Sequence, residues 1–364
     1  MSKHAKIILG ILVVAALFVW GVVSQKNVSD MSVIQIGLMA PLSGNVAFLG
    51  EGIRDAAIMA ERELNARPES KYAYEVIVED DAFDVKKTAS AVQKLVSIDR
   101  VSALISLASA AGNVVNPVAE RNHIVHFGIA SDPNVANGDY NFVHWTPPAE
   151  EAKVFVSELK RRGYKKVAIL GANIQGVAAV AEAVIQETNG TDVSVVNNQV
   201  FDFGTKDFRT MIVKAETTRP DIYLLLAFSP ELEIMTGQIR DLGVKASVTS
   251  IESFEQSDRP QMYEGLWYVN AADSTNEFNE AYKSLYGRVP SLGAGNAYDI
   301  VHLIATAAEK VSGNPTPDKI AEKLYEIRGE RGALGELSVG PEGLVRSKAV
   351  VREIRDGKPV TIGK

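Results

Sequence analysis

The sequence contains no cysteine and carries more acidic than basic side chains. Without Cys, the 364 residues can form no disulfide bond, thiolate nucleophile, iron–sulfur cluster or Cys-ligated zinc site, and they lack the lipid-modified cysteine of bacterial lipoproteins. The formal net charge of −7 argues against a nucleic-acid surface, which needs clustered Lys and Arg. The hydrophobic content of 46% is ordinary for a folded protein, and the length predicts two domains.

The motifs of common enzymes are lacking as well. The first predicted turn from strand to helix has Asp55 where a dinucleotide-binding G-x-G-x-x-G loop needs its third glycine. The sequence has neither a phosphate-binding G-x-x-x-x-G-K-[ST] loop nor a G-x-S-x-G nucleophile turn. His123 and His126 are three residues apart, but the second falls in a predicted strand, so surface or capping roles are favoured over a metal pair. We therefore expect no enzyme, no cofactor and no metal site.

The N-terminus carries a long hydrophobic run. Lys3 and Lys6 precede residues 7–23, which form an uninterrupted apolar segment. As a helix this segment would span about 26 Å, between the length of a signal-peptide core and that of a comfortable membrane crossing. The basic flank should stay in the cytoplasm, so the rest of the chain is expected in the periplasm or on the outer face of the membrane. Residues 1–32 are predicted to be a signal peptide or an N-terminal membrane anchor, and the sequence leaves both open.

From residue 33 onward, short apolar segments alternate with amphipathic helices. Segments rich in Val, Ile and Leu, such as 103–107 and 166–170, are predicted strands. This alternation predicts an α/β fold with two Rossmann-like lobes, each built on a mostly parallel sheet with helices on both faces. The predicted lobes are 33–147 with 272–332 and 148–271 with 333–364. Residues 349–360 are expected to form a hairpin.

Ligands of open α/β sheets bind beyond the carboxyl ends of the strands, so polar residues there are candidates for a site between the lobes. Ser109 follows a predicted strand at the start of a helix, whose free N–H groups and positive dipole suit a carboxylate. Ser131 adds a hydroxyl group in the neighbouring loop, and Glu252 follows a strand of the other lobe, where it could pair with an ammonium group. The alternatives are that Ser109 only caps its helix and that Glu252 is a solvated loop acid. Together the three residues predict a hinged cleft that a small zwitterion bridges.

Five segments in order resemble a known family. They are IGLMAPLSG at 36–44, ELNA at 63–66, EDDAFDVK at 79–86, FGTKDF at 203–208 and NAYD at 296–299. Over residues 33 to about 355 the chain is similar to the branched-chain amino-acid (Leu/Ile/Val) type of periplasmic substrate-binding protein, the soluble receptor of an ABC importer. The resemblance implies the type I periplasmic-binding fold, with three crossings between the lobes, and a permease in the membrane as partner. We expect a monomer.

The resemblance also assigns roles to individual residues. Ser109 and Ala110 match the family's carboxylate-binding turn, and Ala130 and Ser131 match the next loop, which binds the ligand head group. Glu252 matches the acid that holds the ligand's ammonium group.

Two further positions concern the side chain of the ligand. Leu49 stands where relatives often place an aromatic residue over that side chain, and Phe228 stands close to a cleft aromatic of the second lobe. Many relatives have Tyr-Gly after the first strand of that lobe, whereas this chain has IQGV at 174–177. The departure argues against a strict leucine-type specificity and leaves room for a larger or more polar ligand.

The resemblance leaves a second function open. The same cleft, tethered by an uncleaved 7–23 helix, could report its ligand to a signalling partner instead of a transporter. A mature protein that begins near Gln25 would argue against such a tethered sensor.

Overall fold

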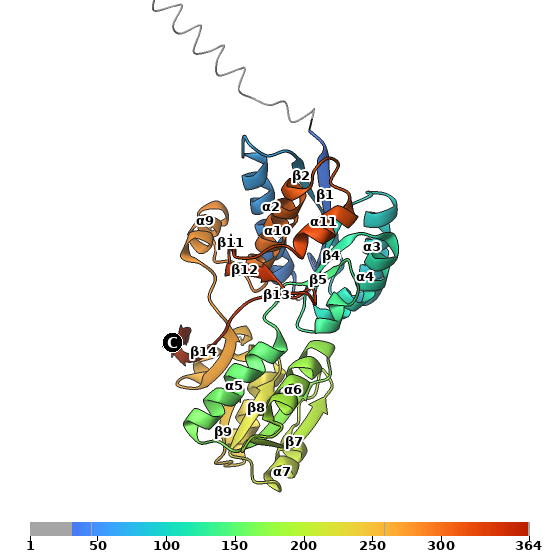
Figure 1. Cartoon of the computed structure of the whole chain (residues 1–364). Helices are drawn as coiled ribbons and strands as arrows, with labels where there is room; N and C mark the ends of the chain where they lie inside the picture. Colours follow the sequence, from blue (N-terminus) through green and yellow to red (C-terminus); the bar gives the residue numbers. More distant parts are fainter. Residues whose placement is uncertain (1–30, 45, 258, 363–364) are drawn as a thin grey trace, which may run out of the picture.

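The computed structural model describes residues 31–362 except 45 and 258, and the chain in this range forms two α/β lobes (Figure 1). The predicted signal peptide or anchor lies outside the described residues, so the structure does not bear on it. In the part of the chain that is described, no helix combines the length and the apolar character needed to cross a membrane.

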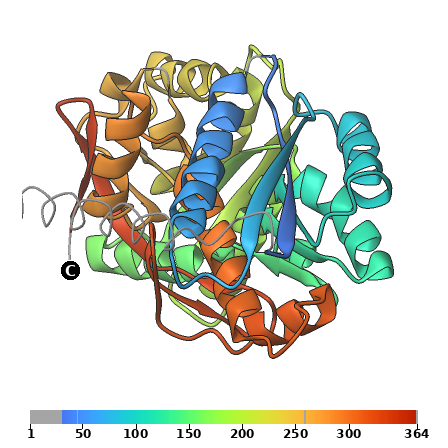
Figure 2. The ribbon, with the colours of Figure 1, turned by 90° about the horizontal axis from the view of Figure 1, so that it is seen from above.

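Lobe 1 is built on a parallel sheet with the strand order β2-β1-β3-β4-β5. The strands are β1 (Val33–Ala40), β2 (Ala73–Asp80), β3 (Ala103–Leu107), β4 (Val125–Ile129) and β5 (Asn141–Val143). One face is covered by α2 (Ala47–Asn65), α10 (Ala294–Lys310) and α11 (Pro317–Leu324), and the other by α3 (Val85–Ser97) and α4 (Ser109–Asn122). In the view from above, α2 and the pair α3 and α4 lie on opposite sides of β1 (Figure 2).

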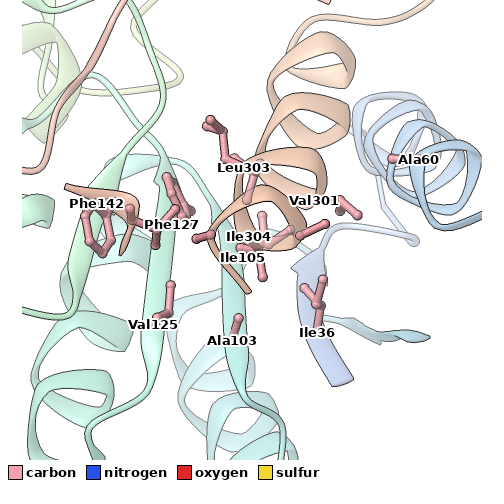
Figure 3. Close-up of a cluster of buried hydrophobic side chains, with 14 of the residues drawn as sticks. Ile36, Ala60, Ala103, Ile105, Val125, Phe127, Phe142, Val301, Leu303 and Ile304 are labelled. Atoms are coloured by element: carbon pink, nitrogen blue, oxygen red, sulfur yellow. The ribbon is translucent and has the colours of Figure 1, made fainter. Parts of the chain in front are cut away.

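The core of lobe 1 explains why a segment from the end of the sequence returns to it. Helix α10 is apolar on nearly every side, and its Val301 and Ile304 are fully buried. Figure 3 shows Ile304 beside Ile105 of β3, with Ala60 of α2 beyond α10. A helix that is apolar on nearly every side is stable only inside a core, which fixes α10 on the sheet beside α2.

Lobe 2 repeats this plan with the strand order β7-β6-β8-β9. Its strands are β6 (Lys166–Ala172), β7 (Ser194–Phe201), β8 (Ile222–Leu226) and β9 (Ser247–Ser250). Helices α5 (Pro148–Arg162) and α6 (Gln175–Thr188) cover one face, and α7 (Arg209–Glu216) and α8 (Glu231–Asp241) cover the other. The predicted mostly parallel sheets with helices on both faces are therefore confirmed.

The last strands of the chain form antiparallel pairs beside the parallel sheet of lobe 2. Strand β10 (Trp267–Ala271) pairs antiparallel with β14 (Ala349–Arg355), and a single parallel bridge joins its Val269 to Ile251, just after β9. The predicted terminal hairpin is present, because β14 turns into β15 (Lys358–Thr361) with Arg355 opposite Lys358. Helix α9 (Asn276–Tyr286) follows β10 and packs on lobe 1.

The expected lobe boundary at residue 333 is wrong. The short strands β11 (Glu330–Gly332), β12 (Gly335–Val339) and β13 (Val345–Arg346) belong to lobe 1, where Leu337 and Val345 are buried in the same core as α10. Asp299 of α10 also accepts a hydrogen bond from the backbone N–H of Leu334, at 3.0 Å. Within the described residues, the chain crosses between the lobes at 144–147, 272–275 and 347–348.

The two histidines that are close in sequence have different surroundings. His123 lies at the surface beside Asp318, whereas His126 is fully buried on β4. Ser106 Oγ lies 2.8 Å from His126 Nε2, and Asn141 Oδ1 lies 2.8 Å from its Nδ1. Both ring nitrogens of His126 are therefore occupied by neutral partners, which suits a neutral imidazole.

We expect His126 to make the protein sensitive to mild acid. Burial lowers the pKa of His126 from 6.5 to about 4. Between these two pH values, the imidazole is therefore protonated in the unfolded chain and neutral in the native protein. The contribution of His126 to the free energy of unfolding is complete above pH 6.5 and is lost as the pH falls towards 4, a decrease of about 3 kcal/mol. Urea unfolding between pH 4 and 7 should show a weaker pH dependence for His126→Gln than for the parent. The exposed His123→Gln is the control, and equal slopes for parent and His126→Gln would contradict the assignment.

Candidate ligand-binding site

A cavity of about 210 Å³ lies between the lobes, at the carboxyl ends of strands from both sheets. All the residues that the sequence singled out line this one cavity: Leu49, Ser109, Ala110, Ala130, Ser131, Phe228 and Glu252. The structure therefore brings together side chains that are more than 200 positions apart in the sequence.

The lobe 1 wall is built around the start of α4. Ser109 is the first residue of this helix, and the capping position before it is Ala108, with a φ of 74° and no capping side chain. The alternative that Ser109 caps its helix is therefore wrong. Ser109 Oγ instead accepts the backbone N–H of Asp132 at 3.1 Å, so its own O–H proton remains to be donated. The free N–H groups of the first turn of α4 also point out of the N-terminus of the helix, towards the cavity.

Lobe 2 meets this wall at the start of α6. A methyl group built on Gly176 would lie 3.3 Å from Ser109 Oγ and 3.5 Å from Ser131 Cβ. Asn113 of α4 also donates a hydrogen bond to Gln175 Oε1 of α6, at 3.0 Å. The cleft is therefore closed at this end, and the N-termini of two helices from different lobes approach the same point. Both helix ends carry partial positive charge, which favours an anion between them.

Glu252 lies at the other end of the cavity. Its backbone is in the left-handed region, with a φ of 65°, and its Oε1 accepts the indole N–H of Trp145 at 2.5 Å. Because Trp145 lies on the first crossing between the lobes, this hydrogen bond ties the acid to the hinge. The alternative of a freely solvated loop acid is wrong. Burial raises the pKa of Glu252, while the Trp145 hydrogen bond opposes that shift.

The middle of the cavity is apolar. Leu49, Phe83 and Leu292 contribute from lobe 1, and Ile174 and Phe228 contribute from lobe 2. Sequence reasoning missed Phe83, although it lies in a loop after a strand, where ligands bind. It also missed Trp145, for which the sequence offers no local signal because the residue lies in a crossing segment.

A second, polar cavity of about 320 Å³ adjoins the acidic end. The two cavities share Trp145 and Glu252, and the second is also lined by Asn270, Asn296 and Arg352. The acidic end of the site therefore opens towards polar surroundings, whereas the middle offers apolar contacts.

A family model described as periplasmic binding protein matches residues 33–358, which is most of the chain. The chain belongs to this family. Among curated members, the Leu/Ile/Val-binding protein BraC3 of Rhizobium johnstonii is 24% identical over 337 residues, which cover 87% of this chain and 90% of that protein.

Solved structures of periplasmic binding proteins share the fold. The leucine-binding protein LivK from Thermotoga maritima superposes with a TM-score of 0.80 at 21% identity, covering 91% of this chain and 98% of that one. A solute-binding protein of an ABC transporter from R. palustris, in complex with benzoate, has a TM-score of 0.78 at 14% identity and covers 91% of this chain and 96% of its own. The type I periplasmic-binding fold and the resemblance to the branched-chain amino-acid type are confirmed. Membership of the family also gives the protein a solute-binding role outside the cytoplasm.

Proposed function

We propose that this periplasmic binding protein is the receptor of an ABC importer and captures an amino acid or a related small zwitterion or amide. The observation that carries the proposal is the arrangement of opposite charge preferences in one cavity. Ser109, Ser131 and the helix N-termini form an end that favours an anion, and Glu252 forms an end that favours a cation. The R. johnstonii relative is named for leucine, isoleucine and valine, which are zwitterions with apolar side chains.

Each part of such a ligand finds a matching surface. The hydroxyl proton of Ser109 and the N–H groups around Ala110 are suited to the carboxylate, and Glu252 is suited to the ammonium group. An apolar side chain would contact Leu49 and Phe228. A cavity of about 210 Å³ fits a metabolite of amino-acid size better than a larger cofactor.

Binding would be coupled to the relative movement of the lobes. The anion end combines groups from both lobes, since Ser109 and Gly176 face each other across the cleft. A ligand that contacts both lobes stabilises the closed state by its difference in affinity for the closed and open states. The closed protein, acting as a monomer, would then present the ligand to the permease on the outer side of the membrane.

A thermal-unfolding panel of amino acids, amides and small carboxylates tests the proposal. A ligand present at a thousand times its Kd stabilises the native protein by about 4 kcal/mol, which gives a clear rise in the unfolding temperature. We expect the largest rise from an amino acid with an apolar side chain. Stabilisation by benzoate or other simple carboxylates, with none by any zwitterion, would contradict the proposal.

A further inference from the structure

Glu151 is a buried acid that the proposed function does not use. It lies in the first turn of α5, and its side chain is completely buried, whereas the neighbouring Glu150 is exposed. Among the described residues, neither carboxyl oxygen of Glu151 meets an N–H or O–H donor. An ionised carboxylate at this position would lose its hydration without forming hydrogen bonds or an ion pair in its place, so the charged form is strongly disfavoured.

The group beside Glu151 is the carboxyl group of Glu252, which lies within hydrogen-bonding reach. Two carboxyl groups can hydrogen-bond to each other only when one of them holds a proton. Burial and the nearby Glu252 raise the pKa of Glu151 well above its ordinary value. Glu252 already accepts a hydrogen bond from Trp145 and borders the cavity, so it is the member of the pair that carries the negative charge.

In the part of the chain that the structure describes, no cation acts on either member of the pair. The titratable side chains on the elements packed against α5 are Glu182 and Glu187 on α6, Tyr268 on β10, and Arg352, Glu353 and Arg355 on β14. Arg352 is the buried base among them, and it is paired with Glu255 Oε1 at 2.9 Å and with Asp273 Oδ1 at 2.5 Å. Within the described residues, the other groups that act on Glu252 are Trp145 and Glu255, and neither of these is a cation.

We propose that Glu151 and Glu252 share one proton, and that a cationic group bound at Glu252 displaces this proton to solvent. The O–H bond of the Glu151 carboxyl group breaks, the proton passes to water or buffer, and the positive charge of the ligand, bound at Glu252, replaces the positive charge of the proton beside the pair. Glu151 is thus a positioning residue that acts through Glu252. This inference rests on the proposed function in one respect, namely that the ligand carries an ammonium group.

The displacement has a definite sign. A nearby cation favours the ionised form of Glu151, so binding releases protons and affinity rises with pH between the pKa of Glu151 in the bound protein and that in the free protein. The release is at most one proton per ligand, and affinity then rises by about tenfold per pH unit. A ligand without a cationic group should bind without this release.

Calorimetric titration with L-leucine, at one pH near 7.5 in buffers of different ionisation enthalpy, measures the protons released. We expect release by the parent and by the exposed control Glu150→Gln, and none by Glu151→Gln, whose amide still donates a hydrogen bond to Glu252 and keeps the site. If L-leucine binds the parent without proton release, or if Glu151→Gln releases as many protons as the parent, the inference is overturned and the proposed function stands.

A second measurement, which needs no ligand, decides the matter if L-leucine does not bind, an outcome that counts against leucine as the ligand. The raised pKa of Glu151 means that the native protein holds a proton that the unfolded chain loses above about pH 4.3. The stabilisation from this group is complete below that pH and is lost as the pH rises through the native pKa. Urea unfolding between pH 5 and 9 should therefore show Glu151→Gln gaining stability relative to the parent with rising pH. A difference that does not change with pH would overturn the inference.

Discussion

Glu252→Gln is expected to lower the affinity for an amino acid roughly 100- to 1,000-fold, because the ligand's ammonium group would lose its charged partner in a buried site. Glu252 provides the acidic end of the cavity and is fixed by the indole of Trp145. The substitution keeps the shape of the side chain and removes a charge that lies next to the Glu151 carboxyl group. The variant should therefore fold, with a free energy of unfolding equal to or above that of the parent.

Isothermal calorimetry measures the loss, and urea unfolding checks the fold. Glu150→Gln is the matched control, because it removes the same charge from an exposed position in the first turn of α5. The control should bind as the parent does. A Glu252→Gln protein that binds an amino acid as tightly as the parent would refute the role of this residue in holding the ammonium group.

Gly176→Leu is expected to weaken ligand binding without lowering stability. The Cβ atom of any side chain at this position would lie 3.3 Å from Ser109 Oγ across the closed cleft. The longer side chain of leucine would therefore push the lobes apart. Overpacking of this kind costs about 1–3 kcal/mol, and the cost falls only on the closed state, so affinity should fall roughly 10- to 100-fold. The nearest atoms that this Cβ meets belong to Ser109 and Ser131 of lobe 1, so opening of the cleft would remove the conflict, and the backbone of Gly176 does not require glycine.

The matched control is Gly237→Leu. Gly237 lies within α8, and among the described residues a Cβ built on it meets no atom within 4 Å apart from its chain neighbours and the nearby backbone of its own helix. This variant should keep the affinity of the parent and gain stability, because glycine inside a helix is unfavourable by about 0.5–1 kcal/mol. Small-angle scattering with saturating ligand should show a compact parent and a more extended Gly176→Leu protein. Equal affinities for Gly176→Leu and the parent would show that closure at this point does not contribute to binding.

The sequence was sufficient for the main architecture because the strands and helices of both sheets have strong hydrophobic periodicity. It failed where the elements are short. Strands β11 to β13 have few apolar residues, and only the burial of Leu337 and Val345 in the lobe 1 core shows which lobe they join. The pairing of β10 with β14 could not be predicted from the local sequence either. Their residues are some 80 positions apart, and the hydrophobic pattern of one strand does not indicate which strand it pairs with.

The candidate site was predictable to the extent that it follows the general topology of α/β proteins. Ser109, Ser131 and Glu252 each follow a strand, so the rule that ligands bind at the carboxyl ends of strands was enough to select them. Trp145 and Glu151 were not predictable. Each acts through Glu252, which is about 100 residues further along the chain, and a glutamate in an amphipathic helix gives no sign that it is buried.

The central claim is that one ligand bridges an anion-binding end and a cation-binding end of the same cavity. The most direct measurement is calorimetry with the amino acid that gives the largest thermal shift, together with two analogues of it, one lacking the amino group and one lacking the carboxylate. The account predicts that each analogue binds at least about 100-fold more weakly, because each leaves one buried polar end without its partner. If either analogue binds as tightly as the amino acid, the bridging account is contradicted.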